Sequence, residues 1–300
     1  MGSPRQQALL TALLLEADHV VPLERLVDVI WNEAPPASAK SQVRICVSGL
    51  RRLFADHGIT GRIETHPAGY LLKVAPGELD LAAFEEYSIL GRAAAEAGST
   101  VEAVTLYRSA LGVWLGPIGA GLDSKILESV SAKFQETRLT VLEDCFDLEL
   151  KLGRERQIVG ELAAQVTEHP FRERLAAQFM LALFRSGRKV EALEFFRKLR
   201  ARLDDELGIR PAAALRDLEY AILTSDSGRV EIPSNGRNTA DDLRFTINFP
   251  RLLPEQATDA LRTEDRLAKL EQENAELKAE HLVFKRVMSF WMTTWEGETS

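Results

Sequence analysis

Residues 38–56, SAKSQVRICVSGLRRLFAD, contain the helix that decides how the first part of the chain is interpreted. At 100° per residue the apolar side chains fall on one stripe, which comprises Val43, Val47, Leu50 and Phe54, with Cys46 and Leu53 on its flank. The opposite arc collects cations and hydroxyls, namely Lys40, Ser41, Arg44, Ser48, Arg51 and Arg52, and no acid lies between residues 40 and 52. The pattern predicts an amphipathic helix with a basic outer face, with Ser38 as its N-cap residue.

Two shorter helices are expected before this one. Their apolar residues lie within 9–14 and 23–30, and an extended piece at 19–22 separates them. Pro35 and Pro36 break the chain before the basic helix, and residues 62–74 are typical of two short strands around Pro67-Ala68-Gly69. Three helices followed by a hairpin predict a winged helix-turn-helix over residues 1–75.

In such a module the second helix of the pair enters the major groove. Arginine pairs with guanine edges there, whereas lysine and serine more often hold phosphates. Arg62, Thr65 and His66 lie in or beside the wing and are expected near the DNA backbone or the minor groove, although His66 is equally well explained as an ordinary surface residue. A basic helix face alone is usually a solvated surface, so it is the order of elements that favours DNA.

The overall composition limits which classes of protein the chain can belong to. The 300 residues are 45% hydrophobic and 27% charged, which indicates a folded globular protein. A net charge of −8 argues against coating nucleic acid over the whole surface but allows a local basic face. Cys46 and Cys145 are far apart and apolar in context, so we interpret them as core residues in a reducing cytosol.

No enzyme class is supported. The five histidines are scattered, and the sequence contains neither an HExxH zinc motif nor a phosphate loop ending in Gly-Lys-Ser/Thr. We therefore expect no cofactor and no metal. The chain has no signal peptide and no run of about 20 apolar residues, so no membrane partner is expected and the predicted location is the cytoplasm, in association with the nucleoid.

The rest of the sequence predicts three further parts of the chain. Residues 78–224 are helix after helix, with helix pairs that resemble tetratricopeptide units. Residues 225–260 form a polar linker in which 243–249 alternate like a strand without an evident partner. The fold class is thus mainly α: a winged helix-turn-helix, a helical-repeat domain and a C-terminal coiled-coil helix.

The predicted coiled-coil helix spans residues 261–296 and has a heptad seam for homodimerisation. The seam residues are Leu267, Leu270, Asn274, Leu277, His281, Phe284, Met288 and Trp291. Asn274 at an a position favours a two-stranded parallel coil. The alternative is a single amphipathic helix that docks on the repeat domain of the same chain.

Several stretches together resemble the Streptomyces antibiotic regulatory protein family. They are residues 5–54, HPAGYLL (66–72), ELDLAAFEEY (78–87), ALGVWLGP (110–117), ETRLTVLEDCFDLEL (136–150) and residues 169–223. The resemblance covers about three-quarters of the chain and implies an OmpR-like winged helix, the output domain of phosphorelay regulators, followed by a bacterial transcriptional activation domain. The sequence departs from the family pattern in two ways: no N-terminal sheet is expected before the first helix, where family members normally carry one, and Leu115 stands where the family has arginine.

The resemblance implies a pathway-specific activator of antibiotic biosynthesis that binds promoter direct repeats as a dimer and recruits the sigma or alpha subunits of RNA polymerase. It places Arg44, Ser48 and Arg51 in the groove, and Lys40 and Arg52 on phosphates. It assigns polymerase contact to the loop of Asn32, Glu33, Ala34, Pro35 and Pro36, which from its residues alone is equally a proline-stiffened connector.

The competing function is a repeat scaffold that binds proteins, with the N-terminal helices as a mere cap. The charge segregation between residues 40 and 52 and the hairpin after it favour DNA binding over this alternative.

Overall fold

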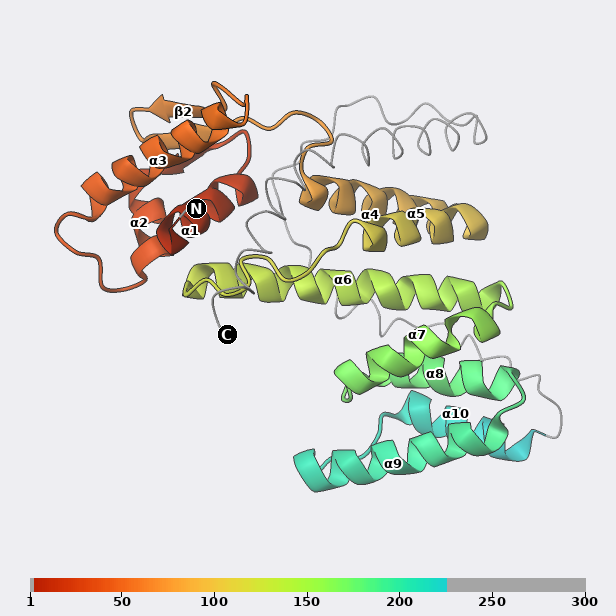
Figure 1. The fold of residues 1–300 in the computed structure, drawn as a ribbon. Coiled ribbons are helices and arrows are strands. Elements are labelled where there is room, and N and C mark those ends of the chain that lie inside the picture. Colours follow the sequence, from red (N-terminus) through yellow and green to blue (C-terminus); the bar gives the residue numbers. More distant parts are fainter. Residues whose placement is uncertain (1–2, 226–300) are drawn as a thin grey trace. The chain divides into compact units, whose positions relative to one another are not determined.

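The computed structural model describes residues 3–225. The predicted strand-like segment, the predicted coiled-coil helix and all of the predicted linker beyond Ser225 lie outside these residues. The described chain divides into two compact units between Ile158 and Val159, and Figure 1 shows the order of its elements.

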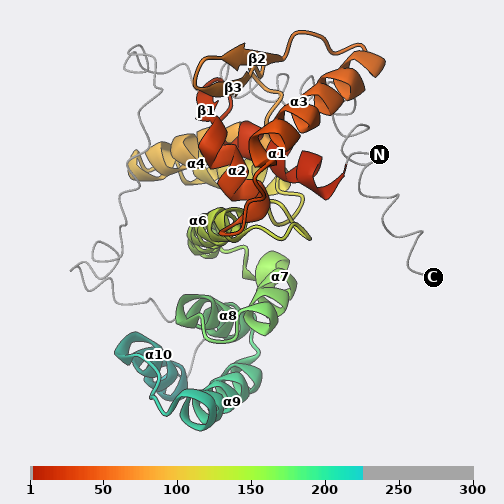
Figure 2. The ribbon, with the colours of Figure 1, turned by 90° about the vertical axis from the view of Figure 1, so that its left-hand side faces the viewer.

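The first unit begins with the predicted winged helix-turn-helix. Its elements are α1 (Pro4–Leu15), β1 (Val20–Pro22), α2 (Leu23–Trp31), α3 (Ala39–Asp56), β2 (Ile63–His66) and β3 (Gly69–Leu72). The three strands form an antiparallel sheet in the order β1-β3-β2 and lie side by side in Figure 2. The hairpin is confirmed, and the extended piece before α2 proves to be a third strand.

Gly69 is required where β1 meets β3. It pairs with Pro22, and a Cβ at this position would overlap the Val21 carbonyl oxygen. A glycine in a strand often marks such a close backbone approach. The conformation of the wing therefore depends on glycine, which has no side chain, at position 69.

The starts of α1 and α3 differ in how their free N–H groups are satisfied. At α1 the Ser3 hydroxyl accepts from the Gln6 backbone N–H, and Gln6 Oε1 accepts from the Ser3 N–H at 2.8 Å, a reciprocal capping box. Ser38 occupies the N-cap position of α3 as predicted, but its hydroxyl accepts from Gln42 Nε2 (2.9 Å) and caps no backbone N–H. The predicted N-cap position is confirmed, and the side-chain bond that usually accompanies it is not formed.

The core of this module lies between α1, α2 and α3. Leu9, Leu13, Leu26, Val43 and Leu50 are fully buried in it. The predicted apolar stripe of α3 is therefore the buried side of the helix. Cys46 and Cys145 are buried free thiols, as predicted for core residues, and burial raises the pKa of Cys46.

Four helices follow the wing: α4 (Asp80–Glu96), α5 (Thr100–Gly112), α6 (Lys125–Lys151) and α7 (Glu155–Glu168). The first two pack closely because Gly91 of α4 leaves room for the Tyr107 ring of α5. The carboxylate of Glu149 is buried on α6 and pairs with Arg108 of α5 (3.1 Å) and Arg154 (3.2 Å).

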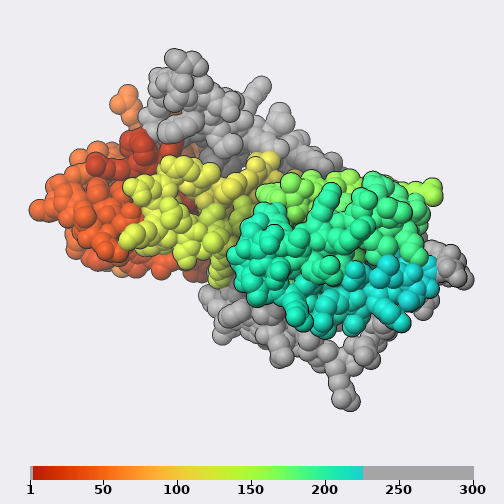
Figure 3. Space-filling model, turned by 90° about the horizontal axis from the view of Figure 1, so that it is seen from below, coloured from red at the N-terminus to blue at the C-terminus, as the bar shows by residue number. Residues whose placement is uncertain are grey.

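The second unit consists of the rest of α7 with α8 (Glu173–Arg185), α9 (Lys189–Leu207) and α10 (Ala213–Thr224). Phe179 and Phe195 stack edge to face between α8 and α9, with ring centroids 5.0 Å apart. The surfaces of α9 and α10 are visible in Figure 3. The predicted succession of helices is confirmed between residues 80 and 224. Within residues 3–225, no helix is both long and apolar enough to cross a membrane.

Candidate nucleic-acid interface

The outer face of α3 is the surface on which the functional prediction depends. Ser41, Arg44, Ser48 and Arg52 are all exposed there. In the part of the chain that the structure describes, none of these four side chains has a hydrogen bond or ion pair. Their donors are therefore available to an external partner. We call these four residues the open face of α3.

Arg51 has a different environment from its neighbour Arg52. Its Nε and Nη2 donate to the Ile63 carbonyl oxygen at 3.1 and 2.8 Å, and Nη2 also donates to Thr65 Oγ1 at 2.8 Å. The guanidinium thus joins α3 to β2 of the wing. Base contact by Arg51 stays a prediction, and a paired contact through Nη2 would require these bonds to break.

Lys40 also has a partner within the chain. Its ammonium lies 2.8 Å from the carboxylate of Glu24 on α2, and this hydrogen bond lowers the pKa of Glu24. Both side chains are well exposed, and exposed ion pairs of this kind contribute little to stability. Lys40 can therefore exchange the carboxylate for a phosphate at small cost.

Arg62, at the start of the wing, is paired with a carboxylate rather than open. Arg62 lies 2.6 Å from Glu78, whose other oxygen accepts from the Ala75 N–H at 2.7 Å. These bonds fasten the strand end to the segment that leads into α4. Arg62 is thus placed as an anchor of the wing, and its predicted DNA contact stays a prediction.

On β2 of the wing, toward the end of the hairpin away from its turn, Glu64 is the central charge. Lys73 lies 2.6 Å from it and His66 Nε2 lies 3.5 Å from it. The Lys73 hydrogen bond is the main cause that lowers the pKa of Glu64, and the same bond raises the pKa of Lys73. The sequence interpretation omitted Lys73, although a cation at a strand end of a wing is a recognisable signal.

The predicted polymerase-contact loop is partly bound to α6. Asn32 Oδ1 accepts from the backbone N–H of Lys125 (2.9 Å), and its Nδ2 donates to the Asp123 carbonyl (3.4 Å). Glu33 pairs with the Lys125 ammonium at 3.0 Å. The loop therefore supplies a cap for the first turn of α6, where an N–H would otherwise lack a partner. Ala34, Pro35 and Pro36 are exposed.

Helix α6 also contributes to the core of the winged helix. Leu127 is 1% exposed and belongs to that core cluster, and Leu122 and Ile126 pack against it. The sequence interpretation treated residues 78–224 as separate and missed this contact. The only signal was a group of apolar residues at the start of a helix.

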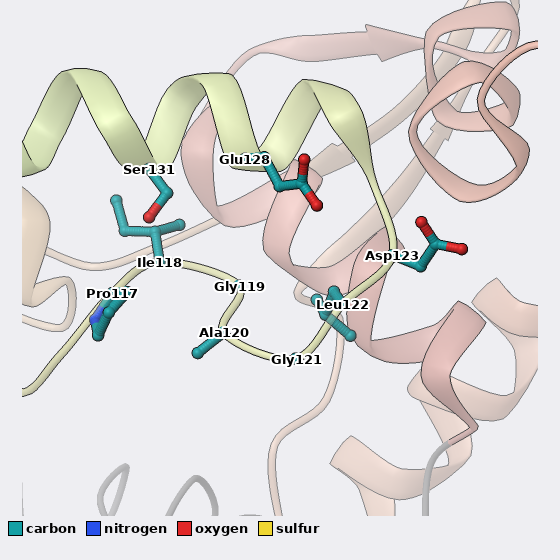
Figure 4. A pocket seen from close by; sticks show the side chains of 9 residues that line it. All are labelled: Pro117, Ile118, Gly119, Ala120, Gly121, Leu122, Asp123, Glu128 and Ser131. Atoms are coloured by element: carbon teal, nitrogen blue, oxygen red, sulfur yellow. The ribbon is translucent and has the colours of Figure 1, made fainter.

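An open pocket lies beside the same turn. Its volume is about 460 Å³, and it is lined by the loop 117–123 with Glu128 and Ser131 of α6, as Figure 4 shows. Its wall is mostly small or apolar. Among the described residues, no group of three or more His, Cys, Asp or Glu side chains is arranged to hold a metal ion.

Both parts of the described chain match known protein families. Residues 2–72 match the family described as "Transcriptional regulatory protein, C terminal", and residues 79–223 match the "Bacterial transcriptional activator domain". Regulatory protein DnrI of Streptomyces peucetius is 39% identical over 233 residues, which cover 75% of this chain and 85% of DnrI. The chain belongs to the Streptomyces antibiotic regulatory protein family. It is a transcriptional regulator of this type.

The chain is also similar to a second Streptomyces regulator and to a solved mycobacterial structure. Regulatory protein AfsR of Streptomyces coelicolor is 36% identical over 86% of this chain, which spans only 25% of AfsR. The solved structure of Mycobacterium tuberculosis EmbR in complex with a low-affinity phosphopeptide superposes with a TM-score of 0.68 at 33% identity, covering 74% of this chain and 59% of that one. The winged-helix and helical-repeat architecture is thus shared with EmbR.

Proposed function

We propose that this regulator binds double-stranded promoter DNA by inserting the open face of α3 into the major groove. The observation that carries the proposal is the pair of uncommitted guanidinium groups, Arg44 and Arg52, on the exposed side of the second helix of a helix-turn-helix. In a chain of net charge −8, such a concentration of free cations matches a polyanion locally. Arginine is the residue that pairs best with guanine edges and with phosphate oxygens.

Different residues of α3 suit contacts to bases and contacts to phosphates. Arg44 and Ser48 lie on neighbouring turns of the open face and suit base edges, whereas Arg52 and Lys40 suit phosphates. Arg51 and Thr65 hold the wing against the helix. We infer that the wing is positioned mainly by contacts within the protein.

The activator role is the next part of the proposal. A regulator of this family would bind direct repeats as a dimer and recruit the sigma or alpha subunits of RNA polymerase at antibiotic-biosynthesis promoters. Ala34, Pro35 and Pro36 are the exposed part of the loop that remains for such a contact. The proposed cytoplasmic, nucleoid-associated location follows from DNA binding.

Selection of duplexes from a random library by the full chain, followed by a mobility-shift assay, tests the proposal. We expect Arg44→Ala with Arg52→Ala to lower the affinity for the selected duplex at least tenfold, since a paired contact of Arg44 to a base edge is worth about 1–3 kcal/mol and Arg52 adds a phosphate contact. The matched control is Lys198→Ala with Arg200→Ala, two exposed cations of α9. It removes the same charge and should leave affinity within about twofold.

Equal losses in the two double variants would contradict the α3 assignment and leave only a general charge effect. Failure to enrich any duplex would favour the alternative, a helical-repeat scaffold that binds proteins. Affinity should also fall steeply with salt, because displaced counterions are released from the DNA.

A further inference from the structure

Ile45 is a large apolar side chain on the outside of α3. Its exposed fraction is 69%, the highest of any large hydrophobic residue on this helix. At 100° per residue it lies nearly opposite the buried stripe, on the same side as Arg52. Its position therefore adds nothing to the core.

A single exposed apolar residue is ordinary on a protein surface and proves little. The surroundings of Ile45 distinguish it. Ser41 and Ser48 lie one turn before and after it on the same face, and Gly49 lies beside it. These neighbours are small, so the Ile45 side chain is the bulkiest apolar group between the cations Arg44 and Arg52.

A partner for this surface has to be anionic overall and still offer an apolar group at short range. The major groove of duplex DNA meets both conditions, because the C5 methyl group of thymine is the apolar feature of its floor. A helix that enters the groove with its open face would bring Ile45 toward the base edges along with Arg44 and Ser48.

We propose that Ile45 contacts a thymine methyl group in the major groove and makes this regulator select thymine at one position of each half-site. The inference rests on the proposed DNA binding and adds a base preference to it. Arginine contacts alone would favour guanine and would not distinguish thymine from uracil.

Replacement of thymine by deoxyuridine, which lacks only the methyl group, tests the inference. The probe is the duplex that the full wild-type chain selects from a random library, with each thymine replaced singly. We expect one replacement per half-site to weaken wild-type binding about three- to fivefold, the effect of burying about one methyl group. Ile45→Ala should bind the original duplex more weakly by a similar factor and become indifferent to that replacement.

Two variants serve as controls. Ile45→Val retains a branched apolar group and should keep the thymine preference. Ile89→Ala removes an isoleucine of α4 that is 54% exposed and should behave like wild type. The comparison between thymine and deoxyuridine is made within each variant, so a change in the folded fraction cancels.

The inference is overturned if Ile45→Ala keeps the same deoxyuridine penalty as wild type, or if no single thymine matters to the wild-type chain. Both outcomes leave the proposed function intact, because a duplex has been selected and bound. A wild-type chain that selects no duplex would overturn the proposed function, and the inference with it.

Discussion

Two adjacent arginines on α3 have opposite environments. Arg51 donates three hydrogen bonds to β2, whereas Arg52 has no partner in the described chain. The sequence places both arginines on the face expected to contact DNA, whereas the structure separates a residue that braces the wing from one that is open. A bracing arginine contributes to folding, and an open one is free to contribute to binding.

We predict that Arg51→Ala lowers the free energy of unfolding by about 1–2 kcal/mol, because it removes donors to the Ile63 carbonyl oxygen and Thr65. Urea denaturation of the full chain measures this loss. Arg52→Ala serves as the control and should unfold within about 0.5 kcal/mol of wild type. Equal stability of the two variants would contradict the bracing role of Arg51.

Glu85 on α4 allows the effect of burial on the pKa of a single carboxyl group to be tested. Desolvation raises its pKa, and the nearby Lys133 offsets part of this effect. A carboxyl whose pKa is raised by folding favours the folded state at acidic pH, and this contribution is lost as the pH rises through the folded-state pKa.

Glu85→Gln should therefore raise the melting temperature at pH 7 and change it less near pH 4, because acid favours the protonated form of the wild-type carboxyl, which burial does not penalise. Glu86→Gln, at the exposed neighbouring position, is the control. Thermal unfolding at the two pH values measures the difference. A gain for Glu85→Gln that is the same at both values would contradict the burial argument.

Helix α6 is capped by a residue from another element. The Asn32 side chain satisfies the Lys125 N–H at the first turn, and Ser124 accepts from the Leu127 N–H at 3.4 Å. Loss of a side chain that satisfies a helix N-terminus costs about 0.5–2 kcal/mol.

Asn32→Ala should lower the free energy of unfolding by about 1 kcal/mol, since the Lys125 N–H loses its acceptor. Asn32→Asp is the control, because it retains the Oδ1 acceptor and should recover most of the stability. Chemical denaturation of the three proteins tests this. An aspartate variant as unstable as the alanine variant would show that the amide donor to Asp123, rather than the cap, is what matters.

At the level of elements, the sequence predicted what depends on local periodicity and missed what depends on distant partners. The stripe of α3 and the hairpin are set by spacing within a few residues, and both were predicted. The pairing of β1 with β3 joins residues about 50 positions apart, and the insertion of Leu127 joins α6 to the N-terminal core. Neither pairing leaves a local pattern.

The candidate site shows the same division. The exposed cations of α3 could be identified from the helical period, because the buried stripe determines which face remains. Whether a given cation is free could not, because Arg51 and Lys40 find partners on other elements. Ile45 was overlooked because an apolar residue on a polar face is not a charge signal.

At the scale of the whole chain, we propose that residues 261–296, which lie outside the described residues, hold two copies together. If the heptad seam pairs two copies, Leu270→Asp with Leu277→Asp should convert a dimer of 33.4 kDa chains into a monomer, because buried charges oppose the seam. Sedimentation equilibrium measures the mass. Lys269→Ala, at an outer c position of the heptad, should alter it little. A monomeric wild-type chain would instead favour docking of the helix on its own repeat domain.

The central claim is that the open face of α3 reads the major groove, and methylation protection tests it most directly. Dimethyl sulfate modifies guanine N7 in the major groove and adenine N3 in the minor groove of the duplex that the wild-type chain selects. We predict that bound wild-type protein protects guanine N7 in each half-site, and that Arg44→Ala at saturating concentration exposes one of those guanines again. Full reactivity of every guanine N7 in the bound duplex would contradict the account.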